Sequence, residues 1–232
     1  LDAKGTRTTV QSSDVRLENG SEPRLEFPKP LTLVRKSAEQ NLTMSANSAH
    51  VTLRTLSGKD SVKSVLLQGG VEFTSKSGDE STVRGKFGSL TYTPGAQVDD
   101  IASAGSCWIE QKTALRTVTL TGTSGNASMG RGAFPLKSAD LSGPVKVTMI
   151  SDGKSGTESY VGTGNHLAYN DEARKVTLRG NVVLEAKSSL FEGTNRGTLL
   201  TLLLNDRREV TEVEMSGDPG TTEYSGKPPK KS

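Results

Sequence analysis

The side chains best suited to acid–base or metal chemistry are few in this sequence and stand far apart. There are two histidines, His50 and His166, and one cysteine, Cys107. A zinc site needs Cys and His residues at short recurring spacings, and a histidine that moves protons is normally held by a neighbouring group. Neither histidine has a second ligand or an obvious carboxylate partner near it in sequence. We therefore expect both histidines to be structural and predict no metal site.

Three other motifs could carry chemistry, and each is better explained by structure. Gly153-Lys-Ser155 resembles part of a phosphate-binding loop, but it lacks the preceding glycine at the required distance and a following helix. The acidic pairs Asp99-Asp100 and Asp171-Glu172 fall in predicted turns, where we expect solvated carboxylates. Cys107 cannot form an internal disulfide, and we expect a packed thiol beside Trp108. The sequence predicts no enzyme and no cofactor.

The elements that would position any site are marked by a repeated glycine. The stretch 175–193 begins with apolar side chains that alternate with mostly polar ones, as in a half-buried strand, and Gly180 stands in the middle of the apolar face. Similar segments surround four further glycines, so that the series is Gly69, Gly105, Gly143, Gly180 and Gly217. Their spacings are 36, 38, 37 and 37 residues. Self-similarity at a fixed period indicates a tandem β-repeat.

Turn signals between these segments agree with a chain of short antiparallel strands. Pro94-Gly95, Asn170-Asp171 and Asn205-Asp206 each separate two alternating segments. Such residues tolerate or preset the dihedral angles of tight turns. A strand about every eight to twelve residues is typical of an all-β protein. The predicted fold class is therefore an all-β, tandem-repeat antiparallel sheet.

The apolar residues around the repeated glycines would form one continuous lining. They are Leu67, Val71, Phe73, Leu141, Val145, Val147, Leu178, Val182 and Leu184. A glycine inside a strand is typical of a bulge or a sharp bend, so a row of them would curve the sheet into a trough around this lining. A trough lined with aliphatic side chains and few aromatic ones suits acyl chains better than rings. Alternatively, the same side chains fill a closed core.

Composition limits the remaining possibilities. Of 232 residues, 32% are hydrophobic and 4% aromatic, which favours sheets with one wet face over a thick globular interior. No apolar run approaches the roughly 20 residues of a membrane-spanning helix, and no signal segment is recognisable, so we expect a soluble chain from which any such segment is absent. Four tyrosines and one tryptophan are too few for the stacking platforms that bind single-stranded nucleic acid.

One stretch resembles a known family. Asn165 to Leu184, NHLAYNDEARKVTLRGNVVL, is similar to the repeat of the OstA-like proteins of lipopolysaccharide export, which include LptA, LptC and the N-terminal domain of LptD. The resemblance is strongest in YNDEARKVTLRGNV (169–182) and is supported by GSLTY (88–92). It implies an incomplete β-jelly roll (β-taco) with an open apolar groove for acyl chains. It also implies head-to-tail pairing with other Lpt-type β-jelly-roll proteins through edge strands.

From this resemblance we expect a non-enzymatic periplasmic protein that shields lipopolysaccharide acyl chains on their way to the outer membrane, as part of a transenvelope bridge or beside one. Lipopolysaccharide or another acylated lipid would be its ligand. A structural or adhesive cell-surface β-repeat protein without a lipid is the alternative. A β-solenoid enzyme acting on polysaccharide would need stacked carboxylates at one repeat position, and the residues flanking the repeated glycines do not supply them.

The sequence also suggests a division of the chain. We expect N-terminal strands over residues 1–44, one OstA-like β-repeat domain over 45–220 and a disordered basic tail over 221–232. The first strand is predicted near Val10 to Leu17 and the last at Glu209 to Met215. Arg7 and Arg16 would then complement the glutamates of the last strand in a weak head-to-tail oligomer.

Overall fold

The computed structural model is built from β-strands and turns, which confirms the predicted all-β class. It describes residues 7–18, 20, 22–38, 40–56, 59–77, 81–130, 134–153, 156–190, 192–217 and 222–223. Within these ranges 17 strands form one sheet. No helix occurs in this part of the chain, and hence none long and apolar enough to cross a membrane.

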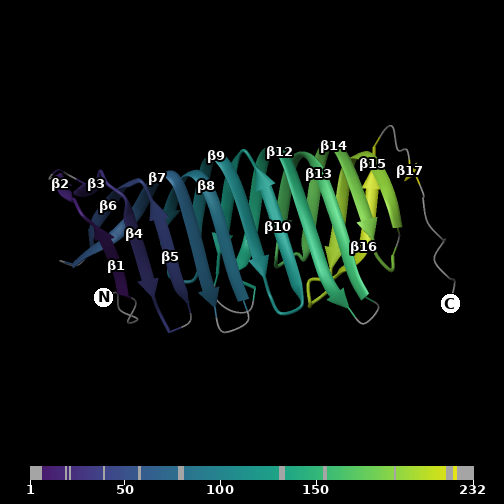
Figure 1. Ribbon diagram of the computed structural model, residues 1–232, viewed down its shortest axis with the longest axis horizontal. Helices are drawn as coiled ribbons and strands as arrows, with labels where there is room; N and C mark the ends of the chain where they lie inside the picture. The colour runs from purple at the N-terminus through teal and green to yellow at the C-terminus, as the bar shows by residue number, and fades with distance from the viewer. Residues whose placement is uncertain are drawn as a thin grey trace.

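The strands stand side by side along the long axis of the molecule, with the N-terminus at one end and the C-terminus at the other (Figure 1). In chain order they are β1 (Arg7–Ser12), β2 (Arg16–Glu18), β3 (Arg24–Phe27), β4 (Leu31–Lys36), β5 (Asn41–Ala46), β6 (Ser48–Leu56), β7 (Lys59–Ser77), β8 (Ser81–Thr93), β9 (Asp99–Lys112), β10 (Arg116–Gly122), β11 (Ser124–Met129), β12 (Leu136–Gly153), β13 (Gly156–Asn170), β14 (Lys175–Lys187), β15 (Glu192–Leu204), β16 (Val210–Ser216) and β17 (Thr222–Glu223).

The long strands bend near their middles, where the pairing slips by one residue. Between β7 and β8, Gln68 pairs with Ser89 and Val71 with Phe87, so that Gly69 and Gly70 oppose the single residue Gly88. The same two-against-one arrangement recurs around the glycines of β9, β12 and β14. This is the geometry of a β-bulge, which bends a strand and increases its twist. We call the row of bulges the bend line.

The bend line divides the sheet into two layers. The first layer contains β1, β4, β5, β10 and β17 with the strand segments 71–77, 81–87, 107–112, 145–153, 156–163, 182–187 and 192–197. The second contains β2, β3, β6, β11 and β16 with the segments 59–68, 89–93, 99–104, 136–142, 166–170, 175–179 and 199–204.

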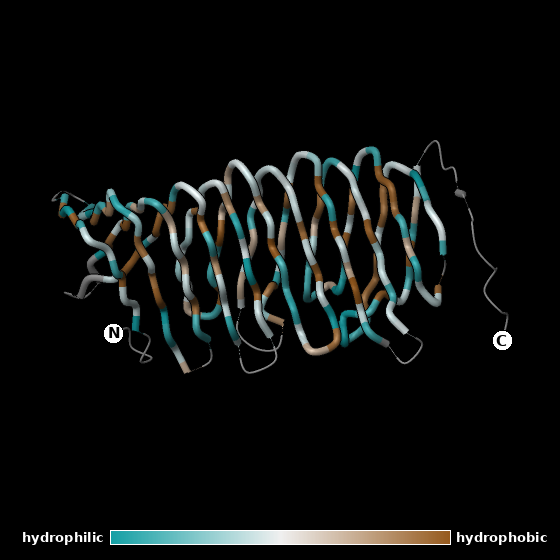
Figure 2. Tube along the Cα trace, viewed as in Figure 1, coloured by the Kyte–Doolittle hydropathy of each residue, from teal (hydrophilic) through white to brown (hydrophobic). Residues whose placement is uncertain are grey.

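The two layers face each other across an apolar interior. A Cβ placed on Gly162, in the first layer, would lie 2.5 Å from Leu178 Cδ1 and 3.6 Å from Leu200 Cδ2, in the second. Apolar and polar residues alternate along the strands (Figure 2), and the buried apolar residues form one cluster from Phe27 to Val210. The alternation thus places one face of each layer inward.

Both ends of the array differ in detail from expectation. The described part of residues 1–44 forms strands, as expected, and β4 and β5 pair with the array and bury Leu33 and Met44. The strand predicted near Val10 to Leu17 is two strands, β1 and β2, which lie in different layers. Within the predicted disordered tail, β17 pairs with β15, and residues 224–232 lie outside the described residues.

Candidate functional site

The nine predicted lining residues all lie in the interior between the two layers. They come from β7, β12 and β14, and each has an exposed fraction of 3% or less. In the second layer Leu178 pairs with Leu167 and Leu200, while Leu184 of the first layer pairs with Gly162. The side chains therefore pack on one another, and the interior has the dense aliphatic character of a core.

The five repeated glycines lie along the bend line, and all have positive φ, from 74° at Gly180 to 98° at Gly217. Four of them also face a polar side chain from an earlier part of the bend line, either within a strand or between two strands. A Cβ would lie 2.8 Å from Asn47 Nδ2 at Gly69, 2.1 Å from Thr123 Oγ1 at Gly143, 2.9 Å from Asn165 Nδ2 at Gly180 and 1.7 Å from Thr198 Oγ1 at Gly217. Glycine is needed here both for its backbone conformation and for this space.

The chain passes between the layers only along the bend line in the described residues. At the opposite edge, which we call the far margin, each turn returns the chain to the layer it came from. The turns after Thr93, Met129 and Asn170 stay in the second layer, and those after Ser77, Lys112 and Lys187 stay in the first. Side-chain contacts are what join the layers at this margin.

Near the N-terminal end, the far margin is joined by an arginine of the first layer. Arg35 Nη1, on β4, lies 2.7 Å from Asp99 Oδ1 and donates to Tyr92 Oη at 2.9 Å, and both partners belong to the second layer. Burial raises the pKa of Tyr92, and the negative charge of Asp99 adds to this effect. Asp99 is 1% exposed, so the prediction of a solvated turn residue was wrong. Its partner lies 64 positions away.

A larger polar cluster lies on the second layer at the far margin, towards the C-terminal end. Asp171 Oδ1 accepts hydrogen bonds from Arg208 Nε at 2.6 Å and Tyr169 Oη at 3.1 Å, and Asp171 Oδ2 lies 3.3 Å from Lys137 Nζ. Burial alone would raise the pKa of Asp171, but the hydrogen bond and charge of Arg208 outweigh it, and the pKa is lowered. At 4% exposed, Asp171 is also not the solvated residue that we predicted.

Two side chains of the first layer contact the second layer here, one at Arg208 of the cluster and one at Leu136, next to Lys137. Arg116 Nη1 donates to the backbone carbonyl of Arg208, and Gln111 Oε1 accepts from the Leu136 backbone N–H at 3.0 Å. Both contacts cross from the first layer to the second. Burial lowers the pKa of Arg116, against the opposing influence of Tyr169.

The histidines have partners that their sequence neighbourhoods do not reveal. His166 Nε2 lies 3.0 Å from Asp140 Oδ1, and His50 Nε2 lies 3.7 Å from Glu26 Oε1. Both partners are distant in sequence and come from the neighbouring strand. No group of three or more His, Cys, Asp or Glu suited to a metal occurs among the described residues. Cys107 is a buried free thiol, as predicted, and burial raises its pKa.

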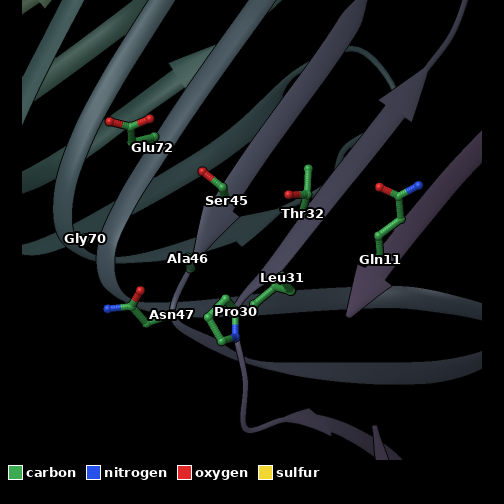
Figure 3. Close-up of a pocket in the computed structure, with 9 residues that line it drawn as sticks. All are labelled: Gln11, Pro30, Leu31, Thr32, Ser45, Ala46, Asn47, Gly70 and Glu72. Carbon is green, nitrogen blue, oxygen red and sulfur yellow. The ribbon is translucent and has the colours of Figure 1, made fainter. Parts of the chain in front are cut away.

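A pocket of about 330 Å³ lies outside the interior, at the N-terminal end (Figure 3). Gln11, Thr32, Ser45 and Glu72 form a row across its floor, on the neighbouring strands β1, β4, β5 and β7. Polar side chains and one carboxylate dominate this row. Its chemistry does not suit an acyl chain, and the aliphatic interior with its far margin remains the candidate site.

No family model, curated protein or solved structure matches this chain significantly. The fold and the site therefore define a class by architecture alone. The protein is a bent β-repeat sheet with a long aliphatic interior, joined by the chain along one edge and by polar side chains along the other.

Proposed function

We propose that this protein is a non-enzymatic lipid-binding protein that holds acyl chains between its two layers. In this proposal the layers form an incomplete β-jelly roll, and the interior between them is the acyl-chain groove. The observation that carries the proposal is that the chain crosses between the layers only at the bend line within the described residues. The far margin can therefore widen without breaking the strand pairing of either layer.

Acyl chains are suited to this interior because they offer the same kind of apolar contact that the lining side chains make with one another. When the layers separate, buried side chains such as Leu178 and Leu184 lose their apolar partners, and a lipid chain restores them. Burying one methylene contributes about 0.8 kcal/mol, so a chain of a dozen carbons could offset the lost contacts of several side chains. The polar contacts at the far margin would have to part or shift to admit it.

The resemblance of residues 165–184 to the OstA-like repeat supports a more specific proposal. Under it, the ligand is lipopolysaccharide or another acylated lipid of the cell envelope, the location is the periplasm, and the protein shields the lipid during transport to the outer membrane. Partner proteins of the same architecture would pair with the end strands. These features extend the lipid-binding proposal and depend on it.

A rod without a ligand is the second candidate. The packing of the interior favours it, because every lining residue is 3% exposed or less. In a rod the same side chains serve only to hold the layers together. The two functions differ in whether lipid enters the interior of the folded protein.

A pair of photo-crosslinking residues separates the candidates. A photo-crosslinker is placed at Leu184, which points inward, or at its exposed neighbour Glu185, which points outward. The protein is exposed to lipid, irradiated and analysed by mass spectrometry. Lipid captured at position 184 and not at 185, by protein with an unchanged circular dichroism spectrum, supports the groove. No capture at position 184 or at the equivalent positions Leu178 and Val147 favours the rod.

A further inference from the structure

The polar cluster at the C-terminal part of the far margin carries an excess of positive charge. Arg116, Lys137 and Arg208 surround one carboxylate, Asp171, which gives three positive charges against one negative charge. The contact near the N-terminal end differs, because there Arg35 has the carboxylate of Asp99 at 2.7 Å. The two arginine contacts across the margin are therefore not equivalent.

Arg116 is the cation of this cluster that forms no close ion pair among the described residues, although the negative charge of Asp171 acts on it. The residue is 5% exposed, and its Nη1 donates to a backbone carbonyl. The Tyr169 hydroxyl interacts with the guanidinium, but Nη2 is buried and has no partner at hydrogen-bond geometry in the described structure. A guanidinium buried with a free donor is costly, and such a group in a native protein calls for an explanation. As a purely structural contact this arrangement is unfavourable, and a bound ligand that accepts from the free donor would explain it.

A second unused donor lies on the same inward face. Gln111 Nε2 is buried without a hydrogen-bond partner, while the Oε1 atom of the same amide is used. Gln111 pairs with Val118, two positions from Arg116 on the neighbouring strand, so the two side chains are diagonal neighbours on the sheet. Long side chains in diagonal positions on neighbouring strands can reach each other, and so both can contact one group bound between them.

Nearby acidic residues are engaged elsewhere. Asp206 lies 2.7 Å from Arg174, and Glu209 Oε2 accepts a hydrogen bond from Asn205 Nδ2 at 2.8 Å. Asp171 already binds Arg208, Tyr169 and Lys137. The site is open to solvent on one side, because the Lys137 side chain is 38% exposed.

We propose that Arg116, Lys137 and Arg208 form a binding site for a phosphate-type oxyanion at the far margin. Guanidinium groups match the geometry of phosphate oxygens, and lysine adds a point charge at the entrance. The oxyanion would accept from Arg116 Nη2 and balance the excess charge. As a deepening of the proposed function, which it presupposes, the anion is the phosphate of an acylated lipid whose chains enter the interior beside it.

The anion itself is tested with inorganic phosphate. Thermal unfolding and calorimetric titration are done in phosphate and in chloride at equal ionic strength. We expect phosphate to raise the Tm of the wild-type protein and Arg116→Gln to weaken phosphate binding roughly tenfold or more, the effect of losing one charge-assisted hydrogen bond. Arg196→Gln, which removes an exposed arginine of β15, is the matched control and should bind like the wild type.

A second variant keeps the test decisive if Arg116→Gln does not fold. Lys137→Gln changes a partly exposed side chain and should also weaken phosphate binding while the protein stays folded. Equal Tm values in phosphate and chloride, or equal phosphate affinity in wild type and Lys137→Gln, would overturn the site.

The source of the anion is tested with a short-chain phosphatidic acid and a diacylglycerol of the same chains. Tighter binding of the phosphatidic acid, with the preference lost in Lys137→Gln, supports a lipid phosphate. If both lipids bind equally and phosphate has no effect, the anion site is wrong and the lipid-binding proposal stands. If phosphate binds and neither lipid does, the anion site stands and the lipid-binding proposal fails.

Discussion

At the scale of single residues, the adjacent glycines Gly69 and Gly70 distinguish two reasons why a position requires glycine, namely a positive φ and a lack of space for a side chain. Both have positive φ, 77° and 65°. A Cβ on Gly69 would lie 2.8 Å from Asn47 Nδ2, whereas a Cβ on Gly70 would meet nothing within 4 Å. The backbone cost is shared, and the steric cost belongs to Gly69 alone.

We therefore expect Gly70→Ala to lower the free energy of unfolding by about 1 kcal/mol, the cost of a left-handed conformation for a non-glycine residue. Gly69→Ala should cost about 2–4 kcal/mol, because the bend must also shift to relieve the clash. Urea unfolding of both variants measures the difference. Combining Gly69→Ala with Asn47→Ala should recover part of the loss. Equal costs for the two single variants would show that Asn47 does not crowd the bend.

The buried tyrosine Tyr169 predicts a loss of stability at high pH. Burial, with the negative charge of Asp171, raises its pKa to about 12. The folded state then keeps the phenol proton at a pH where the unfolded chain releases it, near an ordinary pKa of about 10. Stability from this group is complete below pH ~10 and is lost as pH rises towards 12.

Over that range the loss from Tyr169 should be on the order of 2–3 kcal/mol, since one pKa unit corresponds to about 1.4 kcal/mol. Chemical unfolding at several pH values between 9 and 12 measures it. Tyr169→Phe should show a smaller fall over the same range, although it loses the hydrogen bond to Asp171 at every pH. An identical fall in variant and wild type would assign the pH dependence to other tyrosines.

At the scale of elements, the sequence predicts the strands and their bends well, because both depend on local signals. Alternation and turn residues mark the strands, and the regular spacing of the glycines marks the bend line. The residues opposite the bulges were missed, although they leave a signal. Asn47, Thr123, Asn165 and Thr198 each lie 15 to 22 residues before the glycine that they crowd. Each is a small polar residue between two alternating segments.

The far margin could not be predicted, because its contacts join residues that are distant in sequence. Asp99 and Asp171 carry ordinary turn signals. The folding of one layer over the other brings Arg35 to Asp99, whereas Arg208 reaches Asp171 from a neighbouring turn of the same layer, 37 positions along the chain. Length and composition indicate a thin core, but they do not identify the turn residues whose side chains link the two layers at the far margin. Whether the predicted lining holds lipid is likewise beyond what alternation can specify.

For the ion pair between β4 and β9, we expect that removing one charge destabilises the fold more than removing both. Arg35→Gln leaves the carboxylate of Asp99 buried at 1% exposed, and we expect a loss of about 3–5 kcal/mol in the free energy of unfolding. The double variant Arg35→Gln with Asp99→Asn removes both charges and should be more stable than the single variant. A double-mutant cycle from urea unfolding gives the coupling energy. Additive effects would mean that the pair does not couple the layers.

At the scale of the whole molecule, the array does not close on itself within the described residues, and each layer ends there in strands with an unpaired edge. In the second layer the edge strands are β2 and β16. The N-terminal edge exposes Val15 and Leu17 on either side of Arg16, and β16 exposes Glu212 and Glu214. Unpaired edges add further strands unless charge or proline prevents it.

We expect these two edges to pair head to tail, since Arg16 and the glutamates of β16 lie in the same layer. Arg7 lies in the other layer, on β1, and so cannot take the role that the sequence suggested for it. Sedimentation at rising protein concentration should show weak oligomers. Their association should weaken with salt, because at 0.1 M ionic strength exposed charges are screened beyond about 10 Å.

A charge exchange tests this contact more directly than salt does. Glu212→Arg with Glu214→Arg should abolish self-association, and mixing that variant with Arg16→Glu should restore pairing between the two proteins. The matched control is Glu185→Arg, an exposed change on the interior strand β14, which should leave association unchanged. If the wild-type protein stays monomeric at every accessible concentration and no partner pairs with either edge, the proposal that it forms part of a transenvelope bridge is wrong. Binding of lipid by single molecules would then be the whole of the proposed function.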